Sequence, residues 1–291
     1  MVSVYKIAIL GCENSHANTF LRDILTEKRV SDVEVVGVYS EDREAAEKLG
    51  AEFGVPVADR PDQFVGEIDG LIITARHGAA HYPLAQPYIA SGIPMFIDKP
   101  ITIDEDEAVT FMRELKDAGV RVCGGSVTGC SEHIRAMQAL VALQAQGKVL
   151  GGYLRAPVSL ENPYGGFHFY CQHLVQAMTT IFGAYPQSVQ AFSKENTITC
   201  IVRYEAYDVT LVFVEGNYLY YAAVSSENGV VGNSYGFETA FHEEFMEFYR
   251  LLQGGASKDY REFIAPVFIH NAIERALASG KEEPIRPVPE I

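Results

Sequence analysis

Short apolar runs alternate with segments of helical period along the first 123 residues. The runs predict buried strands at Tyr5–Leu10, Val33–Tyr39, Leu71–Ala75, Met95–Ile97 and Val120–Cys123. Nearly continuous apolar strands separated by helices are typical of a parallel sheet that is covered on both faces. The first part of the chain therefore predicts an α/β domain with a Rossmann-type parallel sheet.

The segments between these strands have helical spacing and recognisable ends. The first helix should begin at Asn14 or Ser15, and apolar residues then recur at Ala17, Phe20, Leu21, Ile24 and Leu25. Further helices are expected at Glu41–Phe53, at His81–Ser91 with a kink at Pro87, and at Asp104–Ala118. Gly54 is a suitable helix stop, and the acidic first turn of the last helix suits the helix dipole.

The pattern changes after a helix predicted at Ser131–Gln146. Strands follow at Gly152–Leu160, Ser188–Ser193, Thr197–Tyr204, Val209–Glu215 and Leu219–Ser225. The last four are joined by short turns, which favours an antiparallel sheet. Helices are expected at Cys171–Phe182, Phe241–Leu252 and Phe263–Ser279. We place a domain boundary near Gly124, giving domains 1–123 and 124–291. The second is an α+β domain with a largely antiparallel open sheet, and its last helices could pack back on the first.

Composition narrows the class of protein. The 291 residues suit two domains, and the net charge of −15 argues against nucleic-acid binding. No apolar run is long enough for a membrane helix, and Met1–Leu10 reads as a strand without the features of a signal peptide. The five cysteines form no CxxC pair. We therefore expect reduced thiols, a cytoplasmic location, and neither a nucleic-acid nor a membrane partner.

Ligands of a parallel sheet bind at the carboxyl ends of its strands. Those ends are Gly11, Ser40, Thr74–His77 and Asp98–Pro100, so these positions should converge.

Three segments together resemble the glucose–fructose oxidoreductase / inositol dehydrogenase (Gfo/Idh/MocA) family. A strand ends at Gly11 and a helix follows. His81 precedes Asp98–Lys99–Pro100 by 17 residues, where the family has a His and a Glu-Lys-Pro motif, and Gly165–Gly166 precede His173 on a helix. The segments GCENSH (11–16) and FYCQH (169–173) resemble a subset with a G-x-[DE]-x-S-H first turn. The resemblance covers nearly the whole chain.

The resemblance implies an NAD(P)-dependent dehydrogenase or a relative, acting on a sugar or polyol, with a catalytic His at His173. It also implies a second-domain sheet that forms an oligomer interface. The aromatic segment Tyr218–Tyr221 fits such an interface better than a sugar platform. We accordingly expect a small-molecule substrate and a homo-oligomer, a dimer or tetramer, built through this sheet.

The first turn departs from the glycine-rich phosphate loop. Gly11 is kept, but Glu13 and His16 replace the second and third glycines. A carboxylate about 4 Å from a phosphate costs about 4 kcal/mol at an effective dielectric near 20. Glu13 must therefore turn away, be neutralised, or accept a hydrogen bond from a ribose or substrate hydroxyl. If its charge weakens pyrophosphate binding, Glu13→Gly should tighten it. In the other interpretation, Glu13 and Asn14 merely cap the helix and the cofactor is lost or shifted.

The other candidate cofactor-binding residues come from the strand ends and the loops after them. They are Asn14, Ser15, His16, Ser40, Arg43, Thr74, His77, His81 and Asp98. Ser40 stands where an NAD-binding acid would hold the ribose, and Arg43 could meet a 2′-phosphate; alternatively, Ser40 caps the next helix. The choice between NAD and NADP stays open.

Lys99 is the leading catalytic candidate, because a strand-end ammonium fixed by Pro100 can point at a substrate hydroxyl. His173, Tyr170 and His168 form the second catalytic group, and Phe169 stands where the family usually has Asp. His77, His81, His168 and His173 show no tight ligand spacing, so no metal is expected.

These observations favour an NAD(P)-dependent oxidoreductase acting on a sugar, polyol or related hydroxy compound. One alternative is a non-catalytic ligand-binding or regulatory protein that kept the fold but lost normal cofactor binding. Another is an enzyme that uses a tightly held nucleotide for a non-redox step.

Overall fold

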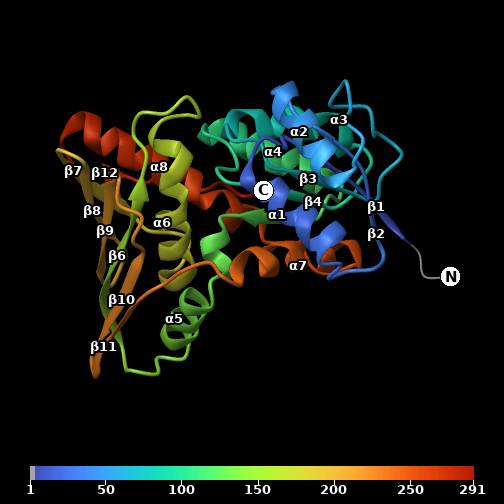
Figure 1. Cartoon of the computed structure of the whole chain (residues 1–291). Helices are drawn as coiled ribbons and strands as arrows, with labels where there is room; N and C mark the ends of the chain where they lie inside the picture. Colours follow the sequence, from blue (N-terminus) through green and yellow to red (C-terminus); the bar gives the residue numbers. More distant parts are fainter. Residues whose placement is uncertain (1–3) are drawn as a thin grey trace.

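The computed structural model describes residues 4–291, so the first three residues of the predicted strand Met1–Leu10 lie outside it. Its first sheet contains β1 (Tyr5–Leu10), β2 (Val33–Tyr39), β3 (Gly70–Ile73), β4 (Met95–Asp98) and β5 (Val122–Gly125). The strand order is β2-β1-β3-β4-β5, and every neighbouring pair is parallel (Figure 1). The predicted Rossmann-type sheet is confirmed.

Helices connect these strands as the sequence predicts. They are α1 (Ser15–Leu21), which continues as the π-helix η1 (Arg22–Thr26), α2 (Arg43–Phe53), η2 (Gly78–Ala80), α3 (His81–Ile89) and α4 (Glu105–Asp117). Asn14 and Asp104 cap α1 and α4, and Gly54 ends α2 in the left-handed conformation. Asp42 caps α2 by accepting a hydrogen bond from Ala45 N (3.0 Å), so this helix begins two residues later than predicted.

The second sheet contains β6 (Val149–Val158), β7 (Ser188–Lys194), β8 (Thr197–Arg203), β9 (Asp208–Glu215), β10 (Tyr221–Ser226), β11 (Gly229–Ser234) and β12 (Glu283–Pro284). Their order is β11-β10-β6-β9-β8-β7-β12. The sheet is largely antiparallel as predicted, but β6 inserts between β9 and β10 and runs parallel to β9. The expected direct pairing of β9 with β10 is therefore wrong.

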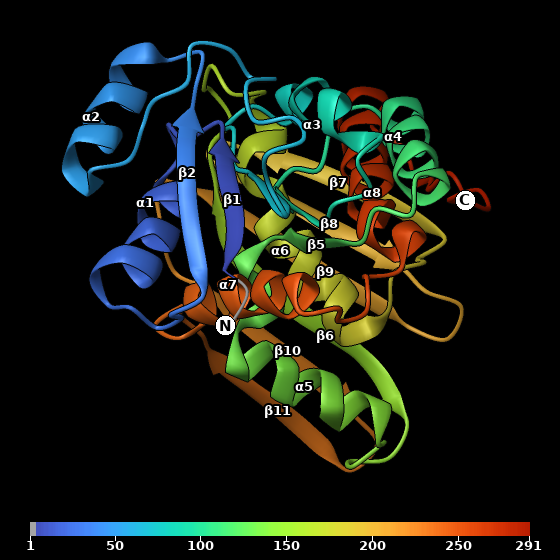
Figure 2. The same ribbon diagram turned by 90° about the vertical axis from the view of Figure 1, so that its right-hand side faces the viewer.

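The helices of the second half divide between the two sheets (Figures 1 and 2). They are η3 (Val127–Cys130), α5 (Glu132–Ala142), α6 (Phe167–Phe182), α7 (Ala240–Leu252) and α8 (Tyr260–Ser279). In Figure 1, α6 and α8 lie between the second sheet and the first domain. Helix α7 returns to the first domain, where Phe245 and Phe248 join the core formed with Phe20 and Phe96.

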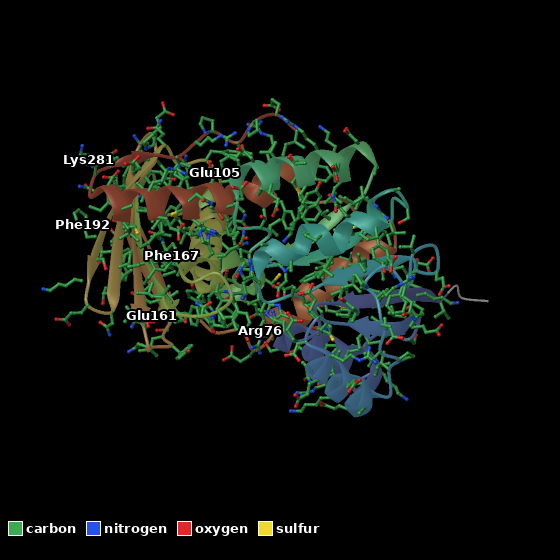
Figure 3. The ribbon with its side chains drawn as sticks, turned by 90° about the horizontal axis from the view of Figure 1, so that it is seen from above. Arg76, Glu105, Glu161, Phe167, Phe192 and Lys281 are labelled. Carbon is green, nitrogen blue, oxygen red and sulfur yellow. The ribbon has the colours of Figure 1, made fainter. Side chains whose placement is uncertain are left out.

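The opposite face of the second sheet is open: no helix of residues 4–291 covers it in Figure 1. Tyr153 on β6 and Phe192 on β7 are exposed, and Phe192 lies at the outer side of the sheet in Figure 3.

All five cysteines are free and buried. Among residues 4–291, no helix has the length and apolarity needed to cross a membrane.

Candidate functional site

The first turn brings the ends of β1 and β3 into contact. Gly11 has φ +72°, and a Cβ there would lie 2.3 Å from the backbone nitrogen of Ala75. Only glycine meets both conditions without strain. The Thr74 hydroxyl donates to Gly11 O (3.0 Å), which fixes the same contact from the other strand.

Glu13 joins the ends of β2 and β3. One carboxylate oxygen accepts from the Ser40 hydroxyl (2.6 Å), and the other accepts from the backbone N–H of Arg76 (2.9 Å). Two protein donors therefore hold the Glu13 carboxylate in place at the first turn.

A cavity of about 760 Å³ opens beside this turn, along the carboxyl edge of the first sheet. We call it the sheet-edge cavity. Its wall includes Gly11, Glu13, Tyr39, Ser40, Glu41, Asp42, Arg76, His77 and Tyr164. Three of these residues are acids, and Arg76 is the only Lys or Arg among the described lining residues. The size and the position suit a nucleotide.

A second cavity of about 370 Å³ lies between the two halves of the chain. We call it the interdomain cavity. It is lined by Asn14, Ser15, His16, Arg76, Lys99, Val127, Tyr164, Phe169, Tyr170, His173, Tyr220, Phe237 and Phe241. Arg76 and Tyr164 line both cavities, and the Arg76 guanidinium donates to the Tyr164 hydroxyl (3.0 Å). Figure 3 shows Arg76 between the two halves of the molecule.

Lys99 reaches the interdomain cavity from the end of β4 and is 4% exposed. Its Nζ donates to Phe169 O (3.2 Å) and lies 4.4 Å from the centre of the Phe169 ring. Burial lowers the pKa of Lys99, although Asp98 and Glu244 oppose that shift. The lysine therefore exchanges a proton more readily than an exposed lysine does.

His173 faces the same cavity from α6. Its Nδ1 lies 2.7 Å from Ser126 Oγ. The Thr128 hydroxyl donates its proton to His173 O (2.9 Å), so in its contact with Ser126 Oγ (2.9 Å) it can only accept. The Ser126 hydroxyl proton is therefore used on Thr128, and Ser126 Oγ must accept from His173 Nδ1–H. Burial, followed by the charges of Lys99 and His16, holds the pKa of His173 well below its usual value. The ring is therefore neutral, with the lone pair on Nε2.

A buried ionic cluster lies behind Lys99. His16 Nδ1 is 3.1 Å from Asp98 Oδ1 and 3.8 Å from Glu244 Oε2. The Asn14 amide donates to Asp98 Oδ2 (2.9 Å), and Lys99 N donates to Asp98 Oδ1 (2.7 Å). These contacts fix the backbone at Lys99.

The charges of this cluster shift one another's pKa values. Burial alone would lower the pKa of His16, but Asp98 and Glu244 raise it overall. Burial opposes ionisation of Asp98, yet His16 and Lys99 lower its pKa. Burial raises the pKa of Glu244 to about 8, although His16 opposes that shift. The ionisation states of these three buried groups behind Lys99 therefore depend on one another.

Comparison with known families identifies the first domain. Residues 5–126 match the model GFO_IDH_MocA, described as an oxidoreductase family with an NAD-binding Rossmann fold. The first domain is therefore similar to that family.

Solved structures are similar to the chain over nearly its full length. A putative myo-inositol dehydrogenase from Sinorhizobium meliloti is 16% identical, with a TM-score of 0.84 over 97% of this chain and 100% of that one. Myo-inositol 2-dehydrogenase from Lactobacillus plantarum is 15% identical (TM-score 0.85; 98% and 100% covered). Scyllo-inositol dehydrogenase from Lactobacillus casei, with bound NAD(H) and scyllo-inositol, is 14% identical (0.84; 97% and 99%). At these identities, the likeness shows a shared fold. No curated protein sequence matches the chain.

Several residues predicted for the cofactor site lie elsewhere. His81 is fully buried, with Nε2 2.8 Å from Ala75 O and Nδ1 3.3 Å from Ile101 O, so it braces the loop after β3. Thr74 is also fully buried. Arg43 pairs with Glu47 (2.8 Å) and Asp59 (3.0 Å) and is not part of the sheet-edge wall.

The predicted catalytic residues also lie in two different places. His173 and Tyr170 line the interdomain cavity, but His168 turns towards α8, where Nε2 meets Glu274 (2.9 Å). The structure therefore does not support a catalytic role for His168. Asn14, Ser15, His16 and Asp98 lie at or behind the interdomain cavity rather than beside the sheet-edge cavity.

The sequence interpretation missed Glu244 and Tyr220. Glu244 lies on the buried face of α7 with Ala240, Phe248 and Leu251, and an acid inside an apolar stripe is a visible signal. Tyr220 precedes β10 and lines the interdomain cavity, whereas Tyr221 lies on the open face. The segment Tyr218–Tyr221 is therefore not one uniform interface stripe.

Proposed function

We propose that this protein is an NAD-dependent dehydrogenase that acts on a sugar, polyol or related hydroxy compound. The observation that carries the proposal is that the two cavities share part of their wall. A ligand in the sheet-edge cavity reaches Arg76 and Tyr164, which also line the cavity that contains Lys99 and His173. A nucleotide and a small substrate can therefore meet at the shared wall.

Gly11, Glu13, Ser40, Arg76 and His77 would hold the NAD, which supplies the hydride acceptor when it is bound. Gly11 keeps the ends of β1 and β3 close together at the cavity wall, and Arg76 offers a cation. The acids Glu41 and Asp42 offer acceptors to ribose hydroxyls and repel a 2′-phosphate. Since Arg43 is already paired, we favour NAD over NADP.

Lys99 and His173 would act on the substrate hydroxyl from opposite halves of the chain. The Lys99 ammonium donates a hydrogen bond to the hydroxyl oxygen and favours its ionisation. His173 Nε2 accepts the hydroxyl proton, because Nδ1–H is committed to Ser126. Removing a group of this kind typically costs about 10²–10⁴-fold in rate.

The wall of the interdomain cavity suggests the substrate class. Tyr164, Phe169, Tyr220 and Phe237 present aromatic surfaces, while Asn14, Arg76 and Lys99 present hydrogen-bond donors. Ring faces suit the C–H surfaces of a cyclic polyol, and the donors suit its hydroxyls. Inositol dehydrogenases are among the similar structures, so cyclic polyols are the first compounds to test.

The proposal includes a homo-oligomer, a dimer or tetramer, that covers the open face of the second sheet. The exposed aromatic residues Tyr153 and Phe192 support it. The unpaired spacing of the five cysteines supports a reducing, cytoplasmic location.

The test measures NADH formation with scyllo-inositol, myo-inositol and simple sugars. We expect turnover with at least one polyol, and Lys99→Met should lower kcat about 10²–10⁴-fold while NAD still binds in calorimetry. Lys281→Met, an exposed lysine far from both cavities (Figure 3), is the matched control and should keep full activity. NAD binding without turnover on any alcohol would favour the non-catalytic alternative. Absence of both would contradict the proposal.

A further inference from the structure

Three side chains with metal-binding chemistry meet between α6 and α8, outside both cavities. They are His168 and Cys171 on α6 and His270 on α8. One ligand atom from each lies within 4.8 Å of the other two, and all three residues are buried. In Figure 3, Phe167, the residue before His168, marks this end of α6 close to α8.

The imidazoles in this cluster lack partners. Within residues 4–291, neither nitrogen of His270 has a hydrogen-bond partner, and the ring is fully buried. His168 Nδ1 is likewise buried without a partner among the described residues. Buried polar atoms are nearly always satisfied, so unsatisfied ring nitrogens on two neighbouring buried histidines indicate a missing ligand.

The remaining contact of His168 fixes its chemistry. Its Nε2 lies 2.9 Å from Glu274 Oε2, which makes Nε2 the nitrogen that carries the proton. The lone pair is then on Nδ1, the atom without a partner. Metal-bound histidines usually donate their other ring N–H to a carboxylate in this way.

We propose that His168 Nδ1, Cys171 Sγ and a ring nitrogen of His270 bind a zinc ion. Two imidazoles and a thiolate are ligands that zinc prefers, and a fourth position can hold water. On binding, the metal–sulfur bond replaces the S–H bond of Cys171, and the proton leaves to solvent. The charge of the ion is balanced by the thiolate and by Glu274, so no net charge is buried.

The site would tie α6 to α8. His173 lies on α6, two residues beyond Cys171, and faces the interdomain cavity. The metal would thus hold the helix that presents His173 without touching the substrate. The chain shows no compact metal motif because one ligand comes from a helix far along the sequence, and of the histidines considered from the sequence only His168 belongs to this cluster.

The test uses the full-length protein stripped with a chelator and titrated with Zn²⁺, and with Co²⁺ as a spectroscopic probe. We expect one equivalent per chain, a thiolate-to-cobalt absorption band and a higher Tm with metal. Cys171→Ala and His270→Ala should lose the band and the tight equivalent. Cys123→Ala and His133→Ala, a buried cysteine and an exposed histidine outside the cluster, should bind as the unmodified protein does.

If the variants of the buried ligands fail to fold, Glu274→Gln still tests the proposal, because the Glu274 side chain is half exposed. It should weaken metal binding about 10–100-fold, as is typical when a residue that hydrogen-bonds to a metal ligand is replaced. Absence of a tight equivalent in the unmodified protein would overturn the proposal. A cobalt spectrum without a thiolate band would overturn it as well.

Discussion

Glu13 holds the first turn together at the point where the chain departs most from a glycine-rich loop. Its carboxylate is bonded to Ser40 and to the backbone of Arg76. A glycine at this position would remove both bonds and free the loops after β2 and β3. The structure therefore favours a useful contact over simple repulsion.

We predict that Glu13→Gly weakens NAD binding by about tenfold, the equivalent of one hydrogen bond of about 1.4 kcal/mol. Calorimetric titration with NAD measures this directly. Glu47→Gly, on the exposed side of α2, is the control for an added glycine. Tighter binding by Glu13→Gly would mean that repulsion of the pyrophosphate dominates.

The buried cluster around His16 makes stability depend on pH. Both His16 and Glu244 have raised pKa values in the folded state, about 8 for Glu244. The folded protein therefore binds more protons than the unfolded chain between pH 4.5, the ordinary pKa of the Glu244 carboxyl, and about pH 8. By linkage, stability falls as pH rises through this window.

We predict that Glu244→Gln flattens this dependence. The loss of unfolding free energy between pH 6 and pH 9 should shrink by about 1–3 kcal/mol, since one pKa unit corresponds to about 1.4 kcal/mol. Urea denaturation at the two pH values provides the measurement, with the exposed Glu195→Gln as control. An unchanged difference in the Gln variant would show that Glu244 is not the titrating group.

Helix α7 follows the second sheet in the sequence, but its apolar side chains pack in the core of the first domain. Its Phe245 is fully buried, with its ring centre 5.8 Å from that of Phe20 on α1. Phe248 and Leu252 approach Gly70 at the start of β3 so closely that a Cβ there would lie 2.9 and 2.5 Å from them.

We predict that Phe245→Ala lowers the free energy of unfolding by about 3–5 kcal/mol, the usual cost of removing a buried phenylalanine. Leu143→Ala, which alters a side chain that is 78% exposed, should change it by no more than about 0.5 kcal/mol. Denaturant titration compares the two. A small effect at Phe245 would mean that α7 is loosely attached.

Local pattern predicted most elements, because each buried strand or amphipathic helix carries its own period. Val33–Tyr39 matches β2 at both ends. Strand β11 was missed since all of Gly229–Ser234 is exposed and shows no alternation. The placement of β6 between β9 and β10 is a long-range pairing that no local signal encodes.

The candidate site was predicted only in part, because local pattern locates strand ends but not the direction of each side chain. Strand ends located Gly11, Ser40 and Lys99, and the resemblance located His173. Side-chain direction decided the rest: His168 and His173 lie on one helix, yet only His173 faces the interdomain cavity. A sequence gives spacing along a helix, but the direction of each face depends on what packs against it.

At the scale of the whole molecule, the second sheet leaves one face open. Tyr153 and Tyr221 are neighbours on that face, with ring centres 6.2 Å apart.

We predict that light scattering finds a dimer or tetramer at micromolar concentration. The double variant Tyr153→Asp with Tyr221→Asp should be monomeric, because charges buried in an interface oppose association. Glu195→Gln, in the β7–β8 turn, should leave the assembly unchanged. A monomeric unmodified protein would contradict the proposed interface.

The return of α7 to the first domain also has a consequence for biosynthesis. The ribosome releases residues 1–126 well before residues 240–252, yet Phe20 and Phe96 are covered by side chains of that later helix. The nascent first domain therefore presents an uncovered apolar surface until α7 has been synthesised. Chaperones that bind exposed apolar segments should engage it during this interval, and premature termination before Ala240 should produce aggregation-prone fragments.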